Sequence, residues 1–304
     1  MPFPWIGQLK PPIRFPMRLV FRLAFTIVVS INGMGTQFLS LPTDAEELSL
    51  GSHPTLKGIS PVNPAMNVAS VQHPTMIIGR GNWLGDVSLT QIGYSQDLSH
   101  KTFHIRLRYA GLQELELRDN RPSDEFLAQF STYGVSADFG FSIEKGNRKY
   151  GMSISGIMMG LYTESSSGIG INMGYVNQLS PSLSFGAVVL NLGKMTKLST
   201  DEPSLPLRLI GGLSKELSFG DNKNELYFSA EWNHLASKRK ITIGNSFNWN
   251  RLRLMGGFSG SESVVQSSAG FGVQVGQYRF SYGIIFGSQN LGVPQTLTFH
   301  LTLP

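Results

Sequence analysis

From about residue 73 to the end of the chain, apolar and polar side chains alternate with a period of two. The stretch TFHIRLRYA shows the pattern, because Phe103, Ile105 and Leu107 fall on one face while His104 and Arg106 fall on the other. Successive side chains of a β-strand point to opposite faces of the sheet, so this period predicts strands with one apolar and one polar face. The chain is therefore predicted to be all-β.

Fourteen segments carry this alternation, and most of them are eight to twelve residues long. A tilted membrane-spanning strand needs about 9–11 residues, and an even number of such strands is typical of outer-membrane barrels. The sequence thus predicts a 14-stranded antiparallel transmembrane β-barrel over residues 73–304. The expected strands are 73–80, 86–95, 102–110, 131–144, 149–160, 167–177, 182–190, 207–218, 224–232, 239–248, 251–259, 267–276, 278–287 and 295–303.

The lengths of the connections test this strand count independently. In such a barrel both chain ends lie in the periplasm, so the odd-numbered connections face outside and are expected to be longer. The two longest connections, 111–130 and 191–206, are both odd-numbered, whereas the even-numbered ones are short. The agreement favours the barrel.

Two water-soluble alternatives are a β-sandwich and a periplasmic repeat protein. A sandwich has to bury one face of each sheet in a shared core. Here the apolar face carries isolated large residues and the other face is mainly Gly, Ser, Thr and Asn, which suits a lipid-facing exterior and a tight polar lumen. A repeat protein requires a fixed sequence period, which the chain does not show.

Composition narrows the functions that are expected. Charged residues make up 15% of the chain, against roughly 25% in soluble globular domains, and there is no cysteine. The net charge of +5 comes without a long basic run, and the six histidines are scattered singly. We therefore expect no enzyme, no metal, no cofactor and no nucleic-acid partner.

The N-terminal region predicts export. Basic residues precede the apolar run LAFTIVVSI at 23–31, and Gly33 and Gly35 follow it at the spacing of a signal-peptidase site. A membrane helix is the alternative, but Arg22 interrupts the apolar run and leaves it too short to span. Residues 1–35 are thus predicted to be a signal peptide cleaved near Gly35, which directs the protein to the outer membrane of a Gram-negative bacterium.

Residues 36–72 carry no clear strand and are predicted to form an N-terminal plug (hatch) inside the barrel. The stretch TDAEELSLG predicts a short helix, with Thr43 or Asp44 as its N-cap and Gly51 at its end. Asn63, Pro64 and Ala65 predict a rigid turn, since proline fixes its own φ and restricts the preceding residue. A floppy periplasmic tail is the alternative, for which the segment is rather too apolar.

Two further groups of residues are candidate functional positions. Charged side chains on the polar faces of the strands are expected to form a lumen network that holds the plug, because ions in a narrow lumen need partners; within it, Arg106 and Arg108 could instead bind a carboxylate. Charged residues of the long connections are expected to contact a partner protein. The lumen set is His104, Arg106, Arg108, Asp138, Glu144, Glu231, Arg279 and His300, and the loop set is Glu114, Glu116, Arg118, Asp119, Arg121, Lys194, Lys197, Asp201 and Glu202.

Two sequence stretches resemble a known family. The opening QFLSLPTDAEELSLG, followed by NPA, resembles the start of the PorV/PorQ proteins of type IX secretion, and VLNLGKMTKLSTDEPSLPLRLIGGLSKEL at 189–217 is similar to their mid-barrel pattern. The resemblance implies the plugged, fourteen-stranded architecture of the FadL fatty-acid transporters. The length of the chain is more similar to PorQ than to PorV, while the final Pro304 departs from the aromatic end of many outer-membrane barrels.

This resemblance implies a function in secretion. The protein would act in type IX protein secretion or in cell-surface attachment of cargo, through extracellular-loop contacts and without catalysis. Its partners would be outer-membrane lipid and secreted cargo or surface-attachment proteins, with a lipid or fatty acid in the lumen left open. Two alternatives remain, a FadL-like transporter of hydrophobic small molecules with the plug as its gate and a purely structural, porin-like barrel.

Overall fold

The computed structural model describes residues 35–57, 62–66, 73–98, 101–118, 126–236, 238–262, 264–287 and 292–303. The expected signal peptide up to residue 34 lies outside these ranges, as do parts of the segment 36–72 and two residues of the loop set, Asp119 and Arg121. Within the described ranges, no helix combines the length and the apolar character that crossing a membrane requires.

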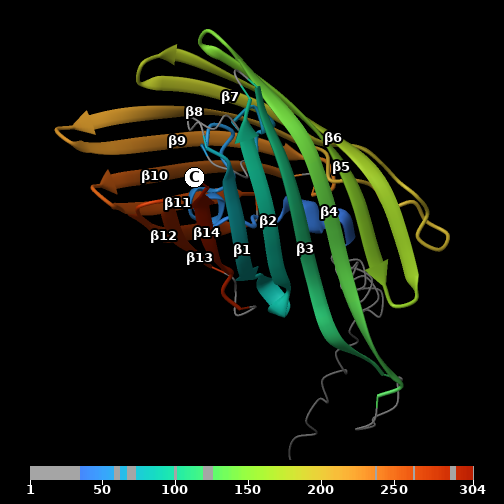
Figure 1. Cartoon of the computed structure of the whole chain (residues 1–304). Helices are drawn as coiled ribbons and strands as arrows, with labels where there is room; N and C mark the ends of the chain where they lie inside the picture. The colour runs from blue at the N-terminus through green and yellow to red at the C-terminus, as the bar shows by residue number, and fades with distance from the viewer. Residues whose placement is uncertain are drawn as a thin grey trace, which may run out of the picture. The chain divides into compact units, whose positions relative to one another are not determined.

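Fourteen antiparallel strands close into a barrel, in which each strand pairs with its neighbours in sequence and β1 pairs with β14 (Figure 1). The predicted fold class is confirmed, and every expected strand has an observed counterpart. The strands are β1 (Thr75–Asn82), β2 (Ser88–Asp97), β3 (Lys101–Leu117), β4 (Ala128–Lys145), β5 (Arg148–Leu161), β6 (Glu164–Ser180), β7 (Leu183–Met195), β8 (Arg208–Phe219), β9 (Asn222–Asn233), β10 (Lys238–Trp249), β11 (Leu252–Ser261), β12 (Val265–Val275), β13 (Tyr278–Phe286) and β14 (Gln295–Thr302).

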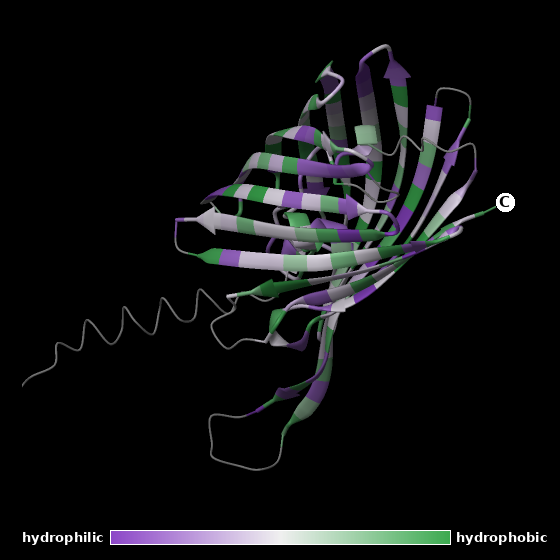
Figure 2. Ribbon diagram, turned by 90° about the vertical axis from the view of Figure 1, so that its left-hand side faces the viewer, coloured by the Kyte–Doolittle hydropathy of each residue, from purple (hydrophilic) through white to green (hydrophobic). Residues whose placement is uncertain are grey.

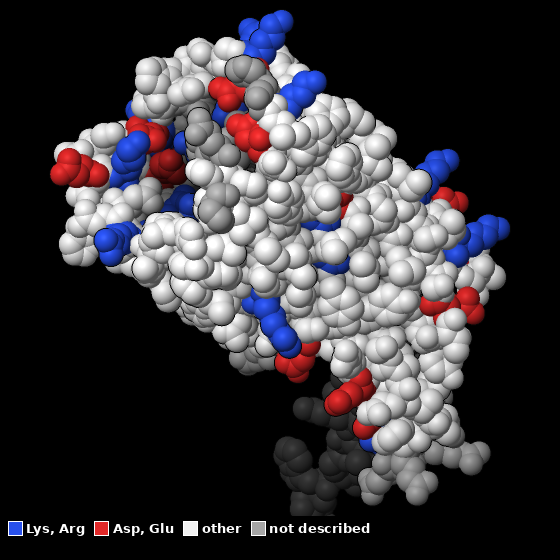
Figure 3. All heavy atoms as spheres, in the orientation of Figure 1, with Lys and Arg blue, Asp and Glu red and all other residues white. Residues whose placement is uncertain are grey.

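The two faces of the sheet differ in the way that the alternation predicts. Ile105, Leu107 and Phe139 are exposed on the outer face, while Ser136 and Asp138 are buried on the inner one. Figure 2 shows the resulting change of hydropathy from residue to residue along the strands. On the face drawn in Figure 3, most charged side chains lie toward the ends of the strands and leave a largely uncharged area between them, as a lipid-facing band requires.

The two ends of the barrel have connections of different length. At the turn end the connections are short, namely 98–100, 146–147, 181–182, 220–221, 250–251 and 276–277. At the loop end they are 83–87, which contains the 3-10 turn η3 (Leu84–Asp86), and 118–127, 162–163, 196–207, 234–237, 262–264 and 287–294. The longest connections, 118–127 and 196–207, thus share the loop end.

The expected connection 111–130 is wrong over half of its length, because β3 and β4 continue as a two-stranded ribbon beyond their neighbours. Their pairing extends to Leu117 and Ala128, with a register shift between Leu112 and Leu115. The alternation of Leu and polar residues in LQELEL supports this ladder. Of the loop set, Glu114 and Glu116 accordingly lie in β3, and Lys194 lies in β7 rather than in a loop.

The barrel encloses the described residues 36–57 and 62–66 of the N-terminal segment, which we call the plug. It consists of the 3-10 turn η1 (Gly35–Ser40), the helix α2 (Ala45–Leu50) and the 3-10 turn η2 (Pro64–Met66). Helix α2 packs on strands β10 to β14, and η2 packs on β4 to β6. Three small apolar clusters join plug to wall, Leu50–Leu56–Tyr227–Met255, Val62–Val188–Leu190–Ile210 and Ala65–Met66–Val176.

Candidate functional site

The junction between plug and wall is the candidate functional site, and its centre is helix α2. Asp44 is the N-cap of this helix, and its carboxylate accepts hydrogen bonds from the backbone amides of Glu46 and Glu47 at 2.7 and 3.2 Å. Gly51 ends the helix with a φ of 74°, a left-handed value that suits glycine. The local sequence therefore forms the helix at the predicted place, with its first turn of acids inside the barrel.

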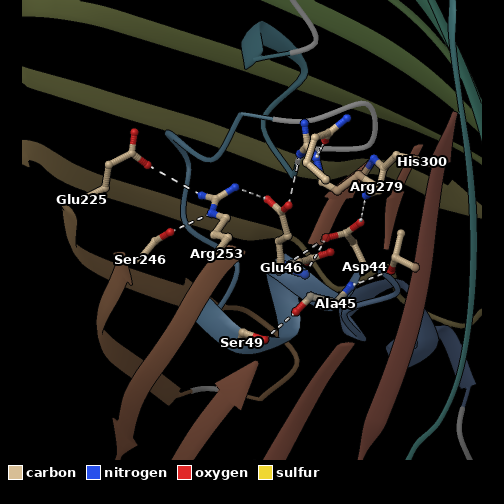
Figure 4. Close-up of polar contacts among 12 residues, drawn as sticks. Asp44, Ala45, Glu46, Ser49, Glu225, Ser246, Arg253, Arg279 and His300 are labelled. Carbon is tan, nitrogen blue, oxygen red and sulfur yellow. Dashed lines mark hydrogen bonds and ion pairs between the residues drawn. The ribbon is translucent and has the colours of Figure 1, made fainter. Parts of the chain in front are cut away.

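Glu46 is buried and joins two strands of the wall through arginines. Its carboxylate contacts Nη1 of Arg253 at 2.7 Å and Nη1 of Arg279 at 3.2 Å (Figure 4). Arg253 also contacts Glu225 at 3.7 Å and donates to Ser246 at 2.7 Å. We call the six residues Asp44, Glu46, Glu225, Arg253, Arg279 and His300 the plug–wall ion cluster.

The two carboxylates of α2 in this cluster have opposite pKa shifts. Burial raises the pKa of Asp44 to about 6, and the charge of Glu46 adds to the rise. Burial opposes ionisation of Glu46 too, but Arg253 and Arg279 outweigh it and hold the pKa of Glu46 below its usual range. Glu46 is therefore expected to stay ionised to a lower pH than Asp44, whose second oxygen lies 3.6 Å from His300.

A second group of charges lies on strands β3 and β4, and we call it the arginine–aspartate cluster (Arg106, Arg108 and Asp138). The buried Asp138 carboxylate contacts Arg106 at 3.0 Å and Arg108 at 3.8 Å, and it accepts a hydrogen bond from Ser155. Arg108 donates to the plug carbonyl of Leu39 at 3.4 Å. Both arginines therefore face a carboxylate of the wall, an arrangement that favours a structural network over an open carboxylate-binding site.

The rest of the predicted lumen set has mixed placements. Glu231 forms a two-point ion pair with Arg208 at 2.6 and 3.0 Å, and Arg208 is a residue that sequence reasoning missed. His104 is buried on the inner face of β3. The structure corrects the prediction that Glu144 belongs to the lumen network. Glu144 is exposed near the turn end and pairs with Lys149 at 3.4 Å rather than with the plug.

The Asn63-Pro64-Ala65 turn is hydrogen-bonded both to the rest of the plug and to the wall. The fully buried Asn63 side chain donates to the carbonyls of Pro54, Tyr175 and Ala187 at 2.8, 3.2 and 3.4 Å. Its Oδ1 accepts from the Ala65 amide at 2.9 Å. Glycines of β5 and β6 permit the close approach, since a Cβ at Gly151 or Gly174 would overlap the turn.

A cavity of about 120 Å³ lies between α2 and the wall near the loop ends of β10 to β12. Burial raises the pKa of Glu47, which lines it and accepts a hydrogen bond from Ser52 at 2.9 Å. The side chain of Lys240 enters from β10. The other polar lining residues include Thr242, Gln266 and Ser268. The lining also includes Leu48, Trp83 and Phe258, so the cavity is mixed in character, and it is smaller than the roughly 300–1,000 Å³ of typical small-molecule sites.

The loop set does not converge on one site. Arg118 pairs with Glu116 at 2.7 Å on the exposed ribbon of β3 and β4. Lys197, Asp201 and Glu202 lie in the separate connection 196–207 and are exposed. In the described ranges, no group of three or more His, Cys, Asp or Glu residues is arranged to hold a metal ion.

The fold and the enclosed plug define a class of protein, the plugged outer-membrane β-barrel. No family model and no curated protein matches the chain. Solved structures do: the toluene transporter TodX of Pseudomonas putida aligns at a TM-score of 0.61 and 12% identity, covering 85% of this chain and 98% of TodX. A FadL homologue of Pseudomonas aeruginosa aligns at a TM-score of 0.55 and 10% identity, covering 86% and 98%. The fold is therefore shared with barrels of the FadL type.

Proposed function

We propose that the chain is an outer-membrane barrel that works through protein contacts at its loop end, in a PorV/PorQ-like role in type IX secretion or cargo attachment. In this proposal residues 1–35 are a signal peptide cleaved near Gly35, residues 36–72 are the plug, and residues 73–304 are the transmembrane barrel. The loop end faces outside, because long connections of such barrels are extracellular.

The observation that carries the proposal is the filled, polar lumen. The described part of the plug is bound to the wall by the buried ion pairs of Glu46 and by hydrogen bonds from the Asn63 side chain to backbone carbonyls of the wall. The cavity beside α2 has a volume of only about 120 Å³ and so leaves little room for a hydrophobic solute. Exposed apolar residues meanwhile gather on the ribbon beyond the barrel, at Leu117, Phe126 and Leu127. Exposed apolar residues that lie together are typical of protein-contact surfaces.

A second candidate function is transport of hydrophobic small molecules, and the comparisons favour it over secretion. The structural neighbours include a toluene transporter and a FadL homologue, and no comparison identifies a type IX secretion protein. An apolar groove of about 460 Å³ crosses β6 to β8, but Met173 and Leu209 at its edges are exposed on the outer, lipid-facing side. Transport would therefore require the plug to move.

The discriminating experiment is affinity purification of the tagged protein from its native outer membrane, with mass spectrometry of both proteins and bound lipids. Secreted or surface-attached proteins recovered with the wild type and with Leu179→Asp, but lost with Leu127→Asp, would support the secretion role. Leu179 is the matched control because it is an exposed leucine in β6 near the turn end. A barrel recovered alone with stoichiometric fatty acid would overturn that role in favour of transport.

A further inference from the structure

Lys240 brings a positive charge to the inner face of β10 near the loop end. It has the strand phase of the buried residues Thr242 and Ser246, so its side chain points into the barrel. The acidic residue opposite it on β9 is Glu231, whose carboxylate is already bound by Arg208 at 2.6 and 3.0 Å. Among the residues that the structure describes, no carboxylate forms an ion pair with Lys240.

Glu47 contributes a buried carboxylate to the same end of the lumen. Ser52 donates a hydrogen bond to it at 2.9 Å, and within the described part of the chain no cation forms an ion pair with it. Burial raises the pKa of Glu47, because its anion has lost contact with water. A buried charge is costly unless it is paired, so an ammonium group bound here would favour the ionised form of Glu47.

The two side chains reach one cavity because of the place where α2 ends. Gly51, at the end of the helix, lies directly against Thr242 of β10, and a Cβ at Gly51 would overlap that side chain. Glu47 is one helical turn before Gly51, and Lys240 is one inward position before Thr242. A helical turn rises about 5.4 Å and two strand residues span about 7 Å. Both side chains accordingly line the cavity of about 120 Å³, and they do not form an ion pair with each other.

The size and the remaining lining of the cavity suit a very small ligand. An engineered cavity of about 150 Å³ in another protein holds benzene, so a cavity of about 120 Å³ has room for a slightly smaller molecule. Ser259 and Gln266 add hydrogen-bonding side chains to the lining, and Leu48 adds an apolar surface. Ser259 and Gln266 are only half-buried, so a small solute can enter the cavity from water.

We infer that this cavity binds a small α-amino acid, with the ligand carboxylate against Lys240 and the ligand ammonium group against Glu47. A zwitterion supplies both opposite charges at once, whereas a simple anion or cation would pair one of the two residues and leave the other without a partner. Glycine and alanine fit the volume, and Leu48 offers the alanine methyl group an apolar contact. The site goes beyond the proposed function and does not depend on it.

The first test is equilibrium dialysis of radiolabelled glycine and L-alanine against the purified full-length protein in detergent. Glycolate and glycinamide are the matched competitors, because they have the size of glycine but lack its ammonium group and its carboxylate, respectively. We expect each of them to compete at least about tenfold less well than glycine, and L-leucine to be excluded by its size. No binding of glycine or alanine at about 10 mM would overturn the inference, as would equal competition by glycine, glycolate and glycinamide.

The second test assigns the two charges to their residues. Lys240→Gln and Glu47→Gln are each expected to weaken glycine binding about tenfold or more. Lys240→Gln should also abolish the preference for glycine over glycinamide, and Glu47→Gln the preference for glycine over glycolate. A merely structural role of the two residues would not change these preferences.

Lys149→Gln and Glu144→Gln are the matched control variants, because these residues form an ion pair near the turn end and do not line the cavity. They should bind glycine as the wild type does. Equal glycine binding by the wild type and both cavity variants, with folding shown by heat modifiability, would overturn the inference. If a cavity variant does not fold, the comparison of glycine with glycolate and glycinamide on the wild type decides.

Discussion

Replacing Glu46 with Gln is expected to loosen the plug more than any other single charge removal in α2. The change leaves Arg253 and Arg279 facing a neutral amide, and breaking a buried ion pair in this way costs about 3–5 kcal/mol. Arg253 keeps Glu225 and Ser246 as partners, and the Arg279 side chain is 38% exposed, so water screens part of the loss. We therefore expect a cost near the lower limit, about 3 kcal/mol, or roughly a hundredfold larger population of undocked plug.

Hydrogen–deuterium exchange of the α2 amides measures this population directly. Glu144→Gln is the matched control, because Glu144 also pairs with a cation but is exposed and lies on β4, whereas α2 packs on β10 to β14. The double variant Glu46→Leu with Arg253→Met is expected to recover part of the protection, since exchanging both partners for apolar residues avoids an unmatched charge. A change in α2 exchange of less than about threefold on Glu46→Gln would refute the reasoning, because exposed pairs alone give effects of that size.

Three further predictions concern the same junction. Burial raises the pKa of Asp44 from 3.8 to about 6, so the contribution of Asp44 to docking is present at low pH and is lost as the pH rises through 6. Burial lowers the pKa of His53 from 6.5 to about 4, so the contribution of His53 is present above pH 6.5 and is lost as the pH falls through 4. The two effects oppose each other. As the pH falls from 6 to 4, the protection factor of the α2 amides, which compares observed with intrinsic exchange, should therefore rise in His53→Gln and fall in Asp44→Asn. Equal pH profiles of the two variants would contradict this. Pro64→Gly should loosen the turn by about 1 kcal/mol, seen as faster proteolysis of the plug and ion leakage in planar bilayers, and no change in either would count against a rigid turn. Gly174→Ala should weaken plug protection by about 1–3 kcal/mol because its Cβ would meet Asn63. Gly156→Ala, whose Cβ would come no closer than 4.0 Å to the Ala137 carbonyl oxygen, should leave protection unchanged; equal effects in proteolysis would disprove the close fit.

The barrel could be predicted from sequence because its signal is local. A period of two needs only a few neighbouring residues to be visible, and it predicts both the strands and the inner face that carries Arg106 and Asp138. The extra length of β3 and β4 was missed because beyond Gly111 the ribbon leaves the expected length of a membrane-spanning strand.

The partners within the lumen could not be predicted in the same way. The contact of Glu46 with Arg253 joins residues 207 positions apart and depends on how α2 is placed across the barrel. Strand phase assigns a face but not a depth, which is why Glu144 shared the phase of the lumen residues and still lies exposed near the turn end. The pair of Arg208 and Glu231 could have been found by aligning β8 with β9, since their strands are adjacent.

The route of the plug has a consequence for the order of assembly. Thr36 donates to the Ser204 carbonyl in a loop-end connection, while the chain reaches β1 at the opposite end, where the Leu303 amide donates to the Pro74 carbonyl. The polypeptide therefore runs lengthwise through a ring whose seam is the β1–β14 ladder. Threading a folded helix and its ion pairs through a finished ring would require breaking all of them, so we expect the seam to be the last ladder to close, around a plug already in place.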